Sequence, residues 1–132
     1  MLAAGRGTRM APLSAELPKA LVPTLDTPQL AWVLSGLQRA GLERVWVNAH
    51  ADYEAIDRVV ARQALQRDMR IEVSHERAMA LGTAGALRPI ADGLTTSFLV
   101  ANADIATDLP IERLMEAHAS AKAPATVLAI PV

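Results

Sequence analysis

Apolar residues along this chain form short, nearly continuous runs that are separated by stretches with helical spacing. Such runs are typical of strands covered on both faces of a sheet, and Phe98, Leu99 and Val100 form the clearest one. The pattern predicts strands over residues 44–49, 70–74, 97–104 and 125–132, and a shorter strand-like segment over residues 1–4.

The stretches between these runs predict helices, because their apolar residues recur every three or four positions. Thr27 is the expected N-cap of the first helix, with Pro28 at its first position. Asp52 is the expected cap of a second helix. The remaining predicted helices are a short one over residues 82–90 and one that starts at Pro110.

The alternation of strands and helices predicts an α/β fold with a mostly parallel, Rossmann-like sheet and helices on both faces. A length of 132 residues suits one domain. In such sheets, ligands bind beyond the carboxyl ends of the strands. The glycine-rich loop after residue 4 and Asp104 both fall at that edge, so we expect the functional site there.

The amino-acid composition predicts a folded protein and limits the kinds of partner that it can bind. Apolar residues make up 52% of the chain and charged residues 20%, which predicts a packed core. The 13 basic and 14 acidic side chains give a net charge of -1, without the basic excess that nucleic-acid binding favours. The chain has no cysteine, no apolar run long enough to cross a bilayer and no signal-peptide pattern. We therefore expect a cytoplasmic protein with neither nucleic-acid nor membrane partners.

Residues 5–24 form a long loop, rich in glycine and proline, whose chemistry suits a phosphate ligand. Gly5 and Gly7 let backbone N–H groups approach a phosphate closely. Arg9 adds a planar set of donors, and Lys19 adds a mobile ammonium further along. Prolines between these two cations limit the freedom that the loop loses on closing over a ligand. We interpret the loop as a grip for a polyphosphate, the alternative being an ordinary surface loop.

Two better-known phosphate motifs do not fit this loop. A dinucleotide-binding fingerprint needs a third glycine where this chain has Met10, and Pro12 interrupts the helix that should follow. The Walker motif needs a Gly-Lys-Ser/Thr sequence, which the loop lacks.

The stretch LAAGRGTRMAPLSAELPKALVP, residues 2–23, closely resembles the signature of the sugar-1-phosphate nucleotidyltransferases. Two later stretches agree in order, LGTAGAL at 81–87 and LVANAD at 99–104. LGTAGAL is most similar to the GDP-mannose pyrophosphorylase branch, and the short connections are similar to those of small N-acetylmuramate-1-phosphate uridylyltransferases. The resemblance covers essentially the whole chain. It implies a nucleotidyltransferase fold of the GT-A-like kind, with residues 1–132 as its nucleotide-binding part.

This resemblance implies an enzyme that joins a nucleoside triphosphate to a sugar-1-phosphate with the help of Mg²⁺. Arg9 and Lys19 are the implied catalytic residues, which hold the phosphates, and Asp104 is the implied Mg²⁺ ligand. The reaction forms no covalent intermediate, so positioning and charge neutralisation carry the catalysis. The residues implied to contact the nucleotide are Leu2, Ala3, Ala4, Gly5, Gly7, Thr8, Gly82, Thr83 and Gly85.

Each of these residues also has a structural interpretation. Asp104 could form an Asx turn at a strand end, and Lys19 could be an ordinary exposed lysine. Thr83 could cap a helix, while Gly82 and Gly85 could serve turns or packing. The histidines lack metal-ligand spacing, and we expect structural roles for them.

Three departures from the family pattern bear on function. The family usually carries Glu or Gln before Leu-Gly-Thr to read the base, whereas this chain has Met79 and Ala80, which leaves Glu76 or Arg77 as substitutes. Ala103 stands where the family usually has glycine. Family catalytic domains are also longer, and their further part normally brings a sugar-phosphate lysine and a second metal carboxylate. We therefore expect a domain that is incomplete at its C-terminal end.

Two functions stay open at this point. The first is a magnesium-dependent transferase that makes a nucleoside-diphosphate sugar. The second is a degenerate nucleotide or nucleotide-sugar binding module with a regulatory role and poor turnover. The joint presence of Arg9, Lys19 and Asp104 favours the first, since a sensor need not keep a metal carboxylate. A third hypothesis, without a catalytic or regulatory role, is a structural fragment whose exposed sheet edge drives self-association into a homo-oligomer. The residues leave the sugar and the base undetermined.

Overall fold

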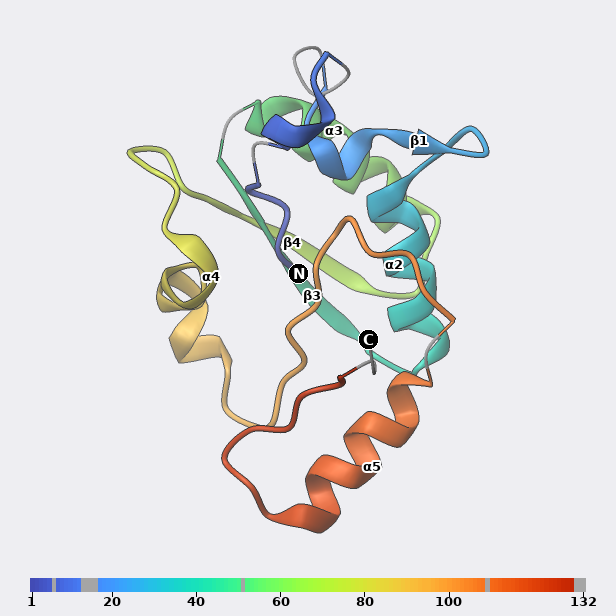
Figure 1. Cartoon of the computed structure of the whole chain (residues 1–132), viewed down its shortest axis with the longest axis vertical. Helices are drawn as coiled ribbons and strands as arrows, with labels where there is room; N and C mark the ends of the chain where they lie inside the picture. The colour runs from blue at the N-terminus through green and yellow to red at the C-terminus, as the bar shows by residue number, and fades with distance from the viewer. Residues whose placement is uncertain (6, 13–16, 51, 109, 130–132) are drawn as a thin grey trace.

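The computed structural model describes residues 1–5, 7–12, 17–50, 52–108 and 110–129 (Figure 1). Its α-helices are α2 (Gln29–Arg39), α3 (Tyr53–Leu65), α4 (Gly82–Gly85) and α5 (Ile111–Ala121). Its strands are β1 (Pro23–Thr24), β2 (Thr27–Pro28), β3 (Arg44–Ala49) and β4 (Arg70–His75). Its 3-10 helices are η1 (Thr8–Met10), η2 (Lys19–Leu21) and η3 (Arg88–Gly93). None of the helices in these ranges has the length and apolar character needed to cross a bilayer.

The central sheet is parallel and includes the N-terminal segment of the chain. Strands β3 and β4 pair in parallel along their whole length. Leu2 bridges Asn48 of β3 on one side and Asn102 on the other, again in parallel. Its N–H donates to Ala101 O at 2.8 Å, and its carbonyl accepts from the Ala103 N–H at 2.9 Å. The order across the sheet is therefore β4, β3, the N-terminal segment and the segment around Asn102, which confirms the predicted parallel α/β fold.

The predicted strands over 97–104 and 125–132 are not regular strands in the described residues, which for the second are 125–129, while 130–132 lie outside them. In the first, pairing is limited to the single bridge between Asn102 and Leu2, because the N-terminal segment beside it is short. Residues 125–129 pair with no strand in the described part of the chain. An extended segment becomes a strand only through hydrogen bonds to a neighbour, and an apolar pattern alone does not supply that neighbour.

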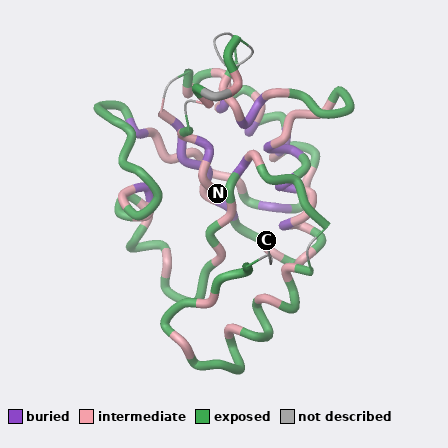
Figure 2. Tube along the Cα trace, viewed as in Figure 1, coloured by how far each residue is buried: buried purple, intermediate pink, exposed green. Residues whose placement is uncertain are grey.

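The buried core lies between the sheet and the helices α2 and α3. Its most deeply buried large side chains are Leu30, Leu34, Val47 and Ile56. Side chains alternate along β3, so Val45 and Val47 face this core while Trp46 faces the opposite side. There a Cβ added to Gly93 of η3 would lie 2.9 Å from Trp46 Cζ2, so helical elements cover both faces of the sheet, as predicted. Figure 2 shows the buried stretches gathered around the N-terminal segment and α2, whereas α5 has no buried residue.

A short hairpin replaces the predicted cap of the first helix. Strands β1 and β2 pair antiparallel around Leu25 and Asp26, whose φ angles of 51° and 58° are those of a type I′ turn. Thr27 is part of β2, and α2 begins after Pro28, so the prediction that Thr27 caps this helix is wrong. Asp52 does occupy the N-cap position of α3, although its side chain makes no capping hydrogen bond.

Candidate functional site

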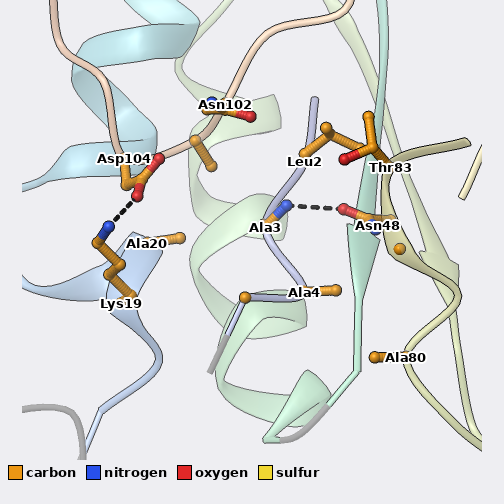
Figure 3. Close-up of a pocket in the computed structure, with 13 residues that line it drawn as sticks. Leu2, Ala3, Ala4, Lys19, Ala20, Asn48, Ala80, Thr83, Asn102 and Asp104 are labelled. Atoms are coloured by element: carbon orange, nitrogen blue, oxygen red, sulfur yellow. Dashed lines mark hydrogen bonds and ion pairs between the residues drawn. The ribbon is translucent and has the colours of Figure 1, made fainter. Parts of the chain in front are cut away.

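A cleft of about 390 Å³ opens at the carboxyl ends of β3 and the N-terminal segment (Figure 3). From the N-terminal segment, the chain adds β3 and then β4 on one side of that segment, and later crosses to the segment around Asn102 on its opposite side. In open α/β sheets, ligands bind where the strand order reverses in this way. Most of the predicted site residues line this cleft, namely Leu2, Ala3, Ala4, Gly5, Lys19, Gly82, Thr83 and Asp104. Gly7, Thr8 and Gly85 are outside the lining, and the side chain of Arg9 lies outside the described part of the chain.

Lys19 and Asp104 form an ion pair in the cleft (Figure 3). Lys19 opens η2, and the buried Ala20 that follows anchors this turn. Asp104 follows Ala103, whose N–H donates to Leu2 O at 2.9 Å, so the sheet holds the carboxylate in place. The Lys19 and Asp104 side chains are 31% and 24% exposed. The Lys19 ammonium and the Asp104 carboxylate thus lie together in a partly shielded position. An anionic ligand can contact the ammonium there, and a cation bound to that ligand can contact the carboxylate.

The start of the glycine-rich loop is a tight turn. Gly7 has a left-handed φ of 62° and leads into η1, where the Met10 N–H donates to Gly7 O at 2.8 Å. A side chain would strain that conformation, so the turn itself favours glycine. A Cβ added to Gly5 would meet no atom of the described residues within 4 Å. Packing therefore does not demand glycine at position 5, and its effect is to leave the backbone accessible from the cleft.

Helix α4 brings Gly82 and Thr83 to another wall of the cleft. Gly82 has a φ of 69°, which residues with side chains rarely adopt. Leu81 occupies the N-cap position, so Thr83 does not cap this helix. A Cβ added to Gly85 would lie 2.9 Å from Leu81 Cβ, so Gly85 allows this turn to pack closely. Its contact with a nucleotide stays a prediction.

Sequence reasoning missed Asn48, which lies between the walls of the cleft (Figure 3). Its Oδ1 accepts the Ala3 N–H at 2.7 Å, and its Nδ2 donates to Glu76 Oε1 at 2.7 Å. The other carboxylate oxygen of Glu76 accepts the Leu81 N–H at 2.8 Å. Asn48 is 7% exposed and Glu76 is 3% exposed. The signal that could have found them is an amide near the carboxyl end of the largely apolar β3 and a carboxylate directly after β4.

The structure does not support Glu76 or Arg77 as a reader of the nucleobase. Both carboxylate oxygens of Glu76 are engaged inside the protein. The Arg77 guanidinium carbon lies 5.9 Å from the centroid of the Tyr53 ring, and neither Glu76 nor Arg77 lines the cleft. Ala80 does line the cleft but offers only a methyl group. The neutral polar side chains of the described lining are Asn48, Thr83 and Asn102.

His75 and His118 pair with residues that do not line the cleft. His75 Nε2 lies 2.9 Å from Asp57 Oδ1, and His118 Nδ1 lies 3.0 Å from Thr126 Oγ1. Within the described residues, no three His, Cys, Asp or Glu side chains gather in a way that could hold a metal ion. In the described lining, Asp104 is the carboxylate, so a metal bound there would need further oxygen ligands from a substrate.

Comparison with known proteins gives a match over the full chain. Residues 1–132 match the family model described as Nucleotidyl transferase. The catalytic subunit beta of mannose-1-phosphate guanylyltransferase from Xenopus tropicalis is 32% identical over 121 residues, covering 89% of this chain and 33% of the relative. Mannose-1-phosphate guanylyltransferase 1 from Arabidopsis thaliana is 27% identical over 136 residues, covering 100% of this chain and 37% of the relative. The chain thus spans about a third of the length of these relatives.

Solved structures share the fold. HddC from Yersinia pseudotuberculosis, complexed with GMP-PN, superimposes with a TM-score of 0.77 at 25% identity, covering 89% of this chain and 52% of that one. A UDP-glucose pyrophosphorylase from Acinetobacter baumanii gives a TM-score of 0.72 at 19% identity, covering 93% and 52%. The second likeness concerns the fold alone.

Proposed function

Because this chain belongs to the nucleotidyl transferase family, we propose that it carries the nucleotide-binding part of a sugar-1-phosphate nucleotidyltransferase. The observation that carries the proposal is the meeting of Lys19 and Asp104 in a cleft lined by the first residues of the chain. The sequence motifs predicted a phosphate-binding ammonium and a metal carboxylate far apart in the chain, and the fold brings them within contact distance.

In the proposed reaction, a phosphate oxygen of the sugar-1-phosphate attacks the α-phosphorus of a nucleoside triphosphate. A new P–O bond forms, and the bond from the α-phosphorus to the oxygen that bridges to the β-phosphorus breaks. Pyrophosphate leaves with that electron pair. The protein then has to hold the two substrates in line and to neutralise their charge, which suits a site made of backbone groups and one ammonium.

Lys19 and Asp104 would change partners when the triphosphate binds. The Lys19 ammonium would donate to phosphate oxygens, which are stronger partners than one partly exposed carboxylate. The Asp104 carboxylate is then available to hold Mg²⁺, and its oxygen donors fit that hard cation, which proteins commonly hold by one or two carboxylates together with substrate phosphates. Bound Mg²⁺ would neutralise charge on the transferring phosphate.

The nucleotide would lie over the N-terminal segment and against α4. Ala3, Ala4 and Gly5 line one part of the cleft, and Gly82 and Thr83 line another. The accessible backbone at Gly5 supports close approach of the ligand there. We assign the β and γ phosphates to the adjoining turn at Gly7, Thr8 and Arg9, where backbone N–H groups and a guanidinium are the expected donors.

The relatives suggest the substrate pair. The curated relatives described above are mannose-1-phosphate guanylyltransferases, and one structural neighbour was solved with GMP-PN. We therefore propose a guanine nucleotide and mannose-1-phosphate as the first pair to test. We also propose a cytoplasmic setting, in keeping with the absence of cysteine from the sequence.

Two measurements on the purified chain test this function. Calorimetry with GTP and Mg²⁺ should show binding, and addition of mannose-1-phosphate should release pyrophosphate in a coupled assay. The same assay with ATP, CTP and UTP gives the base preference. In the full-length protein, binding without release of pyrophosphate would favour the nucleotide-binding module instead, and absence of nucleotide binding would refute the proposal.

A further inference from the structure

Glu76 lies behind the cleft rather than in it, yet it is joined to two of its walls. One carboxylate oxygen accepts a hydrogen bond from Asn48 Nδ2, and Asn48 Oδ1 in turn accepts the N–H of Ala3. The other oxygen accepts the N–H of Leu81, which directly precedes Gly82. We infer that Glu76 is a positioning residue that holds the two nucleotide-contacting walls together through Asn48, an inference that rests on the proposed function.

The hydrogen bonds that join Ala3, Asn48, Glu76 and Leu81, which we call the relay, all run from donors toward the Glu76 carboxylate. The Ala3 N–H donates to Asn48, the Asn48 amide donates to Glu76, and the backbone of Leu81 donates to the other side of the same carboxylate. A buried carboxylate is stable only when its oxygens are satisfied, and no cation pairs with Glu76 in the described part of the chain. Charge-assisted hydrogen bonds therefore hold it, and they also set which end of the Asn48 amide faces Ala3.

The sheet fixes the position of Glu76 itself. Its backbone N–H donates to Ala49 O at 2.7 Å, which continues the β3–β4 pairing by one residue. Its carbonyl oxygen lies 2.6 Å from His50 Nδ1. The following residues, 77–81, are exposed. The carboxylate thus stands on a rigid strand end and tethers the exposed loop at Leu81 just before α4 begins.

This arrangement predicts which ligand binds more weakly when the hydrogen bonds of the relay are broken. Ala3 and the turn at Gly82 both line the cleft, so loosening the relay moves backbone on two sides of the proposed nucleotide seat. Lys19 and Asp104 are held by other contacts and keep their places. A broken relay should therefore weaken binding of the nucleotide and leave binding of pyrophosphate nearly unchanged.

Three variants test the relay by exchanging donors and acceptors at positions 48 and 76. Glu76→Gln places an amide N–H against a donor, either the Leu81 N–H or Asn48 Nδ2. Asn48→Asp places two carboxylates in contact. In the double variant the new carboxylate at position 48 accepts from both Ala3 and the new amide at position 76, whose oxygen still accepts from Leu81. Each single variant should weaken GTP binding by about 10-fold or more, and the double variant should recover to within about 3-fold of the original chain.

Two readouts decide the outcome, calorimetric affinity for GTP and amide hydrogen exchange of Ala3 and Leu81 without ligand. Asp57→Asn serves as the control, because it removes only the charge of the His75 partner on the α3 side, outside the cleft, and should leave GTP affinity unchanged. Faster exchange at Ala3 in Glu76→Gln, reversed in the double variant, supports the relay. Unchanged GTP affinity in both single variants overturns it.

Failure of the proposed function and failure of this inference give different results. If the original chain binds no nucleotide, the proposed function fails, and exchange at Ala3 alone decides the relay, with unchanged exchange in Glu76→Gln overturning it. If both single variants fail to fold, the double variant decides. A folded double variant that binds GTP supports the relay, and an unfolded one overturns it.

Discussion

Polar groups at the cleft are held in two opposite ways. Lys19 and Asp104 pair as full charges on partly exposed side chains. Asn48 and Glu76 are almost fully buried and are joined by hydrogen bonds. A partly exposed ion pair contributes little to stability and separates at low cost, whereas opening a satisfied buried network leaves polar groups unpaired. The first arrangement suits an exchange of partners when a ligand binds, and the second suits the maintenance of a fixed shape.

Loss of the buried carboxylate should have the largest effect on stability. Glu76→Ala leaves the Asn48 amide and the Leu81 N–H without their acceptor, and we expect the free energy of unfolding to fall by about 2–4 kcal/mol. Urea denaturation measures this. Glu72→Ala, on the strand that leads to Glu76, is a matched control, because it breaks only partly exposed ion pairs and should cost less than about 1 kcal/mol. Equal losses in the two variants would contradict the comparison.

Loss of the ammonium should affect turnover instead of folding. Lys19→Ala removes charge-assisted hydrogen bonds to the phosphates, each worth about 1.5–3 kcal/mol, so pyrophosphate release should slow by about 10–150-fold. Its melting temperature should stay close to that of the original chain, because the ion pair is partly exposed. Lys122→Ala, at the C-cap of α5, is the control for loss of a lysine. A large fall in melting temperature with normal turnover would reverse our interpretation of Lys19.

The Met1 ammonium, at the other end of the N-terminal segment, tests how burial of a charge affects the free energy of unfolding. The Met1 ammonium donates to Trp46 O, and burial lowers its pKa from 8.0 to about 6. Between pH 8 and 6 the unfolded chain therefore binds more protons than the folded chain, so stability is complete above pH 8 and falls as pH drops toward 6. The loss should reach at most about 2–3 kcal/mol. Unfolding free energies across this window measure it, and an N-acetylated chain, which lacks this ammonium, should lose less.

The smallest expected effect concerns the carboxylate of the ion pair. Asp104→Asn relieves Lys19 of its partner, so the affinity for pyrophosphate without Mg²⁺ should rise by about 2–5-fold. The Mg²⁺ dependence of GTP binding should weaken at the same time, because a neutral amide is a poorer ligand for a hard cation. Calorimetric titrations with and without Mg²⁺ measure both. An unaltered Mg²⁺ dependence would remove Asp104 from its proposed role.

The errors in the sequence predictions share one cause. The apolar runs at 97–104 and 125–132 were expected to be strands, but the described residues of both form none, because strand formation depends on a neighbour that no local pattern reveals. Thr27 was predicted to cap a helix, but it pairs with Thr24 in the short hairpin. Glu76 looked available to a base, but Asn48 and Leu81 occupy its oxygens. In each case a partner elsewhere in the chain decided the outcome.

The sequence by itself determined the α/β class, the order of the main helices, the phosphate-type loop and the family, because periodicity and contiguous motifs are local properties. Lys19 and Asp104 were also named from local motifs. Tertiary structure alone decided that these two charges meet, and that Asn48 joins Ala3, 45 residues away, to Glu76, 28 residues away. Hydrogen bonds between such distant residues exist only once the sheet has set its strand order and register, so no local pattern encodes them.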